Sequence, residues 1–129
     1  MKLATLQAGQ FVETGGYYAK GAAGQAKYLV KTAAQATSDG DIIDTYGNVT
    51  LQNGNVAILS YQYHNQAVCY GTSETSVDNK LQIQACIDNN TDRNIYLPNY
   101  SCELIPTSNA GALFVGSTST AIYGGAGCE

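Results

Sequence analysis

The chain has 129 residues, a net charge of −4 and only 12% charged residues, so it has room for one domain or two small ones. It contains no cluster of lysine and arginine, which excludes a protein that binds the nucleic-acid backbone. Its apolar runs are far shorter than the roughly 18 to 20 residues of a membrane-spanning helix, which excludes membrane insertion.

Short β-prone segments separated by glycine, asparagine and aspartate predict a small β-rich unit at the start of the chain. The predicted strands are residues 10–13, 27–31, 41–44, 49–51 and 56–59. The dipeptide Asn53-Gly54 lies between the last two and tolerates the positive φ angles of a two-residue type I′ turn, so a hairpin is expected there. A helical turn is predicted at residues 32–36, ended by the turn-forming residues 38–40.

The second half predicts one helix followed by a series of short strands. Ser76 or Asp78 is expected to cap a helix that runs to Asp88, after which an asparagine-rich segment ends it. The helix carries an apolar stripe that must pack on something, formed by Leu81, Ile83, Ala85 and Ile87. Strands at residues 94–98, 102–106, 112–115 and 121–123, separated by turn residues, favour a stack of strands.

The four cysteines are expected to be buried free thiols. Cys69, Cys86, Cys102 and Cys128 lie far apart along the chain, without the close pair that zinc sites usually show, and His64 is the only histidine. Nothing else in the sequence indicates a secreted scaffold held together by disulfides. The sequence therefore predicts no metal site and no other cofactor.

The second half resembles a known family of parallel β-helices. Residues 77–88 (VDNKLQIQACID) followed by 94–98 (NIYLP) look like the entry of the pectate-lyase-like right-handed β-helix superfamily, a TDDTAAIQAAID helix before a VYLPAG strand. Residues 119–125 (STAIYGG) are similar to the early rung TTLKGDG of that family. The resemblance implies that residues 77–129 are a capping helix and the first rungs of a right-handed parallel β-helix, truncated after them.

The first half is similar to the small domain that precedes the β-helix in many bacteriophage tailspikes. The matching segments are residues 15–21 (GGYYAKG), 24–30 (GQAKYLV), 40–44 (GDIID) and 50–57 (TLQNGNVA). Residues 21–24 (GAAG) depart from the usual GDGG, and residues 68–78 replace the usual FGAxGDGxTDD approach to the helix. The expected organisation is a β-rich neck or adaptor domain at 1–62, a junction at 63–76 and the β-helix start at 77–129, mainly β with one or two short helices.

The tailspike resemblance also implies a function. The chain is expected to be the N-terminal structural or adaptor part of a receptor-binding tailspike, located in the phage tail, that links the virion to a glycan-binding or depolymerising β-helix. The implied partners are further copies in a homotrimer, other tail or baseplate proteins, and a bacterial surface polysaccharide contacted by a later part of the protein. The alternative is a catalytically competent polysaccharide lyase or glycosidase, and a third interpretation is a prophage remnant without a receptor role.

No catalytic residue is predicted in this chain. Glycoside hydrolysis needs two carboxyl groups facing one bond, and the catalytic residues of the family lie beyond the rungs present here. Turns or solvated surface are the favoured positions of the candidate acids, which are Asp39, Asp41, Asp44, Asp88 and Glu103. Two interpretations stay open for Tyr61, Tyr63 and Tyr70: packing at a junction or trimer interface, which is favoured, or stacking against a glycan.

Overall fold

The computed structural model describes residues 5–76, 78–91, 93–100, 103–105, 113 and 121–124. Its strands form two sheets of different kinds. The first sheet is antiparallel with the order β1-β2-β4-β3, and the second is the parallel pair β5-β6. The strands are β1 (Phe11–Thr14), β2 (Ala26–Lys31), β3 (Val49–Thr50), β4 (Val56–Leu59), β5 (Ile95–Tyr96) and β6 (Ile122–Tyr123). The helices are α1 (Ala33–Asp39), the 3₁₀-helix η1 (Ala67–Tyr70) and α2 (Lys80–Asp88).

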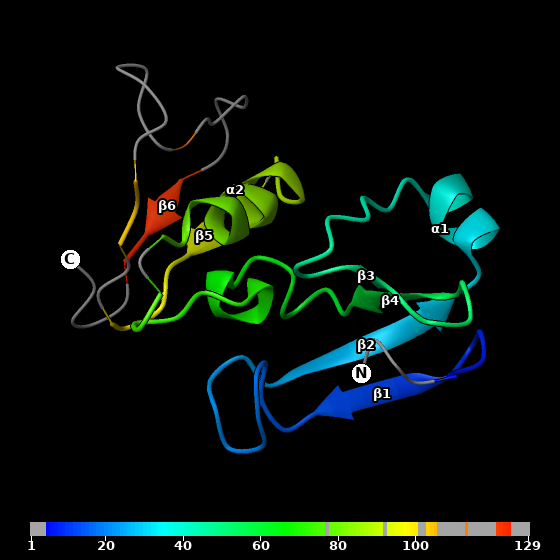
Figure 1. Ribbon diagram of the computed structural model, residues 1–129. Coiled ribbons are helices and arrows are strands. Elements are labelled where there is room, and N and C mark those ends of the chain that lie inside the picture. Colours follow the sequence, from blue (N-terminus) through cyan, green and yellow to red (C-terminus); the bar gives the residue numbers. More distant parts are fainter. Residues whose placement is uncertain are drawn as a thin grey trace.

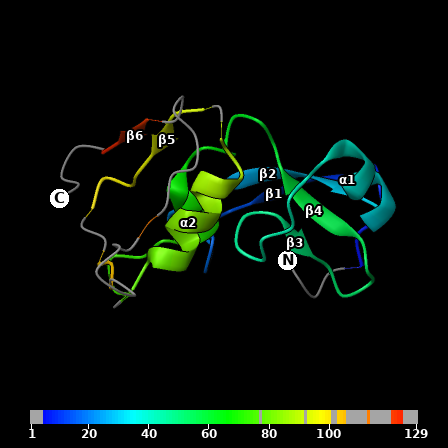
Figure 2. The ribbon, with the colours of Figure 1, turned by 90° about the horizontal axis from the view of Figure 1, so that it is seen from above.

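The antiparallel sheet and the parallel pair lie at opposite ends of the molecule, with α2 and η1 between them (Figure 1). Seen from above, α1 lies at the end farthest from β6 (Figure 2). The described residues are mainly β with two short α-helices, as predicted. No helix in this part of the chain is long and apolar enough to cross a membrane.

One hydrophobic core joins the antiparallel sheet to η1, α2 and β5. Side chains alternate along β2, so Ala26, Tyr28 and Val30 are buried. They share a cluster with the buried residues of the later elements, which are Ala67, Cys69, Tyr70, Ile83, Ala85, Cys86, Ile87 and Ile95. Val56 and Ile58 form a separate small cluster with Ala36 of α1. The main core therefore contains residues from both sides of the predicted 63–76 junction.

The hairpin predicted at Asn53-Gly54 is confirmed, but its predicted type I′ turn is wrong. The Leu51 carbonyl accepts a hydrogen bond from the Gly54 N–H (3.0 Å), and the Leu51 N–H donates to the Asn55 carbonyl (2.7 Å). Gly54 is left-handed (φ +84°) whereas Asn53 is not. The loop is therefore longer than two residues, with a single left-handed position. The Asn53 amide donates instead to the Leu6 carbonyl (2.9 Å), which fixes the preceding segment.

The helical turn predicted at residues 32–36 is confirmed and continues to Asp39 as α1. Thr32 is its N-cap: the Thr32 hydroxyl accepts from the Gln35 N–H (3.1 Å), and the Gln35 side-chain oxygen accepts from the Thr32 N–H (3.0 Å). This reciprocal capping box satisfies two N–H groups that a helix start otherwise leaves unpaired. Gly40 ends the helix in the left-handed conformation (φ +77°).

Removing the N-cap is expected to cost about 1 kcal/mol in the free energy of unfolding, measured by urea denaturation of Thr32→Ala. Thr32→Ser keeps the hydroxyl acceptor and should stay within about 0.5 kcal/mol of the original chain. An equal loss in both variants would contradict the role of the Thr32 hydroxyl.

The strand predicted at residues 41–44 is wrong, because these residues form an extended loop without a strand partner. The Asp44 carboxylate accepts hydrogen bonds from the backbone N–H groups of Tyr46 (2.6 Å), Gly47 (2.6 Å) and Asn48 (3.3 Å). The chain therefore turns around this side chain instead of extending beside another strand.

The strand predicted at residues 102–106 is not formed over its described part, residues 103–105. The Glu103 carbonyl accepts from the Asn79 N–H (2.8 Å), and the Ile105 N–H donates to the Asp78 carboxylate (3.2 Å). Backbone groups of this segment therefore pair with the start of α2 rather than with a strand. The strand predicted at 112–115 lies outside the described residues except for Leu113, which is not in a strand.

The predicted strands at 94–98 and 121–123 are confirmed as the short strands β5 and β6. They pair in parallel, with Tyr96 opposite Tyr123. On the other side of β5, Gln66 forms an isolated parallel bridge with Tyr96. Three segments far apart in the sequence thus lie side by side in the same direction, although the described residues form no closed coil.

The helix predicted to run to Asp88 is confirmed as α2. Its N-cap position is Asn79, and the Asp78 carboxylate accepts from the Lys80 N–H (2.9 Å), so one of the two predicted capping side chains bonds the first turn. Of the predicted apolar stripe, three side chains are buried and Leu81 is 57% exposed. The buried ones are Ile83, Ala85 and Ile87.

Candidate functional site

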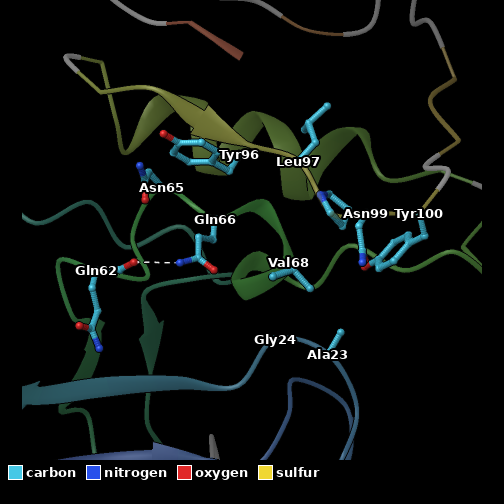
Figure 3. A pocket seen from close by; sticks show the side chains of 11 residues that line it. Ala23, Gly24, Gln62, Asn65, Gln66, Val68, Tyr96, Leu97, Asn99 and Tyr100 are labelled. Carbon is cyan, nitrogen blue, oxygen red and sulfur yellow. Dashed lines mark hydrogen bonds between the residues drawn. The ribbon is translucent and has the colours of Figure 1, made fainter. Parts of the chain in front are cut away.

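A pocket of about 640 Å³ lies between the segment that leads into η1 and the segment that follows β5 (Figure 3). We call it the amide pocket, because four carboxamide side chains line it together with tyrosine rings and small or apolar residues. The carboxamides are Gln62, Asn65, Gln66 and Asn99, and the other lining residues are Ala23, Gly24, Val68, Tyr96, Leu97, Pro98 and Tyr100. None of these residues carries a charge at neutral pH.

Two of the carboxamides are held in place through their nitrogen atoms. Asn65 Nδ2 donates to the Asn94 carbonyl (2.8 Å), and Gln66 Nε2 donates to the Gln62 carbonyl (3.0 Å), the bond drawn in Figure 3. Their side-chain oxygens accept no hydrogen bond from the described residues. The Tyr96 N–H donates to the Asn65 carbonyl (2.9 Å), which ties the two walls of the pocket together.

The tyrosine rings of the pocket are fixed by the strands and by η1. The parallel register places Tyr96 against Tyr123, with ring centroids 5.6 Å apart and planes inclined by 22°. Both rings are 48% exposed. The Tyr100 hydroxyl donates to the Thr72 carbonyl (2.8 Å) just after η1. Stacked and tethered aromatic rings lose little conformational freedom when a ligand packs on them.

The remaining wall is the loop between β1 and β2, which reaches across to η1. The Tyr17 hydroxyl donates to the Tyr46 carbonyl (2.7 Å), and the Tyr18 hydroxyl donates to the Gly71 carbonyl (2.5 Å). Burial raises the pKa of Tyr17 above its ordinary value, so this hydroxyl stays a donor. At Gly24 the backbone approaches η1 so closely that an added Cβ would lie 2.7 Å from the Val68 carbonyl oxygen.

A separate polar network ties the end of α2 to the end of β4. Asn89 Nδ2 donates to the Asp44 carboxylate (2.7 Å), and Asn48 Nδ2 donates to the Asn89 side-chain oxygen (3.3 Å). The Asn48 side-chain oxygen accepts from the Leu59 N–H at the end of β4 (2.9 Å). Burial raises the pKa of Asp44, against the hydrogen bonds from three backbone N–H groups and Asn89, which lower it.

The three tyrosines predicted as interface or glycan-stacking candidates lie in different environments, away from the amide pocket lining. Tyr61 is 76% exposed, and the Arg93 guanidinium lies over its ring at 3.8 Å. Tyr63 is partly buried against the core. Tyr70 is fully buried, and its hydroxyl donates to the His64 carbonyl (2.8 Å).

The candidate acids do not line the amide pocket. Asp39 and Asp41 share the Lys31 ammonium at 2.8 and 2.6 Å. The Asp88 carboxylate accepts from the Gln84 side chain (2.8 Å). Across the described ranges, no three histidine, cysteine, aspartate or glutamate side chains gather as a metal site requires.

Cys69 and Cys86 are buried free thiols, as predicted. Burial raises the pKa of Cys69 to about 11, and it raises that of Cys86 as well. Thiols with raised pKa values are poor nucleophiles at neutral pH. Cys102 and Cys128 lie outside the described residues.

Likeness to known proteins is found in structure only. No protein-family model matches the sequence, and no curated protein matches it either. The enzymatically active domain of tailspike protein 2 from bacteriophage CBA120 superposes with a TM-score of 0.56 and 14% identity, over 92% of this chain and 16% of that chain. Full-length tailspike protein 2 from the Escherichia coli O157:H7 bacteriophage CAB120 gives 0.55 and 14%, over 92% of this chain and 14% of that chain.

These neighbours are bacteriophage tailspikes, and at this identity the likeness is one of fold. The chain spans about one sixth of their length or less.

Proposed function

We propose that this chain is the N-terminal structural part of a phage tailspike, which assembles as a trimer in the virion tail and joins the virion side to a glycan-binding β-helix. The observation that carries the proposal is the main core, which contains residues of the antiparallel sheet together with residues of η1, α2 and β5. A connector must hold two parts in a fixed orientation, and a shared apolar core does so better than a flexible linker.

The parallel register of Gln66, Tyr96 and Tyr123 supports the second part of the proposal. Successive segments of a right-handed β-helix lie in parallel with like residues stacked, as the two tyrosines are here. In this proposal residues 1–62 form the neck domain, 63–76 the junction, and 77–129 the capping helix with the first rungs. Leu81 is exposed on α2, and in this proposal it contacts a neighbouring segment of the tailspike rather than the core.

Exposed apolar side chains support the trimer. Three aromatic side chains are largely exposed: Phe11 of β1 (76%), Tyr18 of the loop after β1 (65%) and Tyr61 of the turn after β4 (76%). Packing on a symmetric copy would remove these side chains from water. The catalytic alternative is not favoured, because the carboxylates described above are paired with Lys31 or bonded to backbone and amide groups.

Light scattering of the purified chain tests this proposal. The expected result is a particle of about three times the 13.6 kDa chain mass, with no release of sugar from capsular or O-antigen polysaccharides. A clean monomer at high concentration would refute the trimer. Cleavage of a polysaccharide by these residues alone would instead support the catalytic alternative and direct mutagenesis to the acids.

A further inference from the structure

We propose that the amide pocket binds a neutral saccharide without cleaving it. This site is distinct from the polysaccharide contact proposed above for a later part of the protein. Its volume of about 640 Å³ falls in the range of pockets that hold small ligands.

The polar groups of the amide pocket match those of a saccharide. A carboxamide presents a donor and an acceptor side by side, which matches neighbouring sugar hydroxyls that each donate and accept. Asn65 and Gln66 are held through their nitrogens, so their oxygens are left as acceptors among the described residues. Gln62 and Asn99 are exposed on opposite walls, where their amides are available to a ligand.

Two tyrosine rings of the amide pocket offer stacking surfaces for a sugar. Tyr96 and Tyr100 lie toward the two ends of the segment that forms the upper wall in Figure 3. The apolar faces of a sugar ring stack on tyrosine, while its equatorial hydroxyls reach out toward polar groups. Tyr96 is already fixed by its stack on Tyr123, so a sugar that packs on it orders little further.

The lining residues that the structure describes are all uncharged. An acidic saccharide would meet no ammonium or guanidinium among them to offset the loss of water from its carboxylate, so a neutral saccharide is favoured. Hydrolysis needs two carboxyl groups within about 10 Å across the bond. The described lining residues include no carboxyl group, which favours binding without cleavage.

Titration of the ¹⁵N-labelled full chain by nuclear magnetic resonance tests this inference. The probes are hexasaccharides of glucose, galactose and mannose, with a galacturonate hexasaccharide as the acidic comparison. We expect at least one neutral probe to shift the side-chain amide signals of Gln62, Asn65, Gln66 and Asn99. The dissociation constant should change less than about twofold between about 50 and about 500 mM salt, because no ion pair is screened.

Gln62→Ala combined with Asn99→Ala is expected to weaken binding at least about tenfold, since each loses a hydrogen-bonding group at the ligand. Both side chains are exposed and make no hydrogen bond with the described residues, so the fold is kept. Gln52→Ala removes an equally exposed carboxamide in the hairpin loop and should leave binding unchanged.

Three results would overturn the inference: no shift with any neutral hexasaccharide, tighter binding of the galacturonate probe, or equal binding by the double variant. The titration measures binding and light scattering measures assembly. A monomer that binds saccharide would therefore refute the tailspike proposal alone, and a trimer that does not bind would refute this inference alone.

Discussion

Gly24→Ala is expected to destabilise the fold by about 3 kcal/mol or more, a large effect for a single added methyl group. Gly24 is left-handed (φ +86°), which costs an alanine roughly 1 kcal/mol. The added Cβ would also lie 2.7 Å from the Val68 carbonyl oxygen and 2.8 Å from Tyr17 Cβ. Neither group yields easily, because one is backbone and the other is bonded directly to backbone, so the loop must lift away from η1.

Gly21→Ala is the matched control for this substitution. Gly21 lies in the same loop with almost the same conformation (φ +85°), and a Cβ added there would meet nothing within 4 Å. It should lose only the roughly 1 kcal/mol of conformational strain. Urea denaturation of both variants isolates the cost of close packing, and equal losses would contradict the contact between this loop and η1.

Asp44→Ala is expected to lower the free energy of unfolding by about 3 kcal/mol, because it removes the acceptor of three backbone N–H groups and of Asn89. These donors lie where water reaches them poorly, so most stay unsatisfied. Asp44→Asn keeps one oxygen for Tyr46 and Gly47 and should lose about 1 kcal/mol. Thermal or urea unfolding measures the stability lost in each variant. An Asp44→Ala variant as stable as the original chain would show that the loop does not depend on this side chain.

The charge of Asp44 adds a pH dependence to that comparison. Burial raises its pKa above the ordinary 3.8, so the folded chain holds the proton more tightly than the unfolded chain. Its contribution to stability is therefore fully present below 3.8 and declines as the pH rises through the folded pKa. The loss caused by Asp44→Asn, which cannot titrate, should be larger at about pH 4 than at about pH 7. The opposite slope would contradict the raised pKa.

Local patterns predicted the elements that depend on neighbouring residues. The capping box at Thr32 and Gln35 and the glycine after Asp39 are signals within one helix, and α1 follows them. The hairpin follows its glycine in the same way. The turn type escaped prediction, because Asn53 is drawn to Leu6, a contact across 47 residues that no local pattern contains.

Long-range partners explain the predictions that were wrong or incomplete. Residues 41–44 have the composition of a strand. The Asp44 carboxylate, however, accepts hydrogen bonds from the backbone that follows it and from Asn89 at the end of α2. Leu81 fits the apolar stripe by spacing, yet the buried face of α2 is set by its contact with η1.

The residues that line the amide pocket were not among the candidates weighed from the sequence, which were acids, favoured as turn or surface residues, and other tyrosines. Its carboxamides come from two segments that β5 and the Gln66 bridge bring together, and a single sequence does not show that pairing. One signal was available: strand alternation places Tyr96 outward whenever Ile95 is buried. The outward ring on a predicted rung was therefore the detectable part of the site.

The shared core also determines when the protein can fold during synthesis. The ribosome releases the N-terminal residues first, yet the buried residues of β2 belong to a core that also contains residues of η1, α2 and β5, which emerge later. Until about residue 95 has left the exit tunnel, the hydrophobic core that contains Tyr28 and Val30 is incomplete. We therefore expect the nascent sheet to expose apolar side chains until then, a stage at which chaperone binding would protect the chain from aggregation.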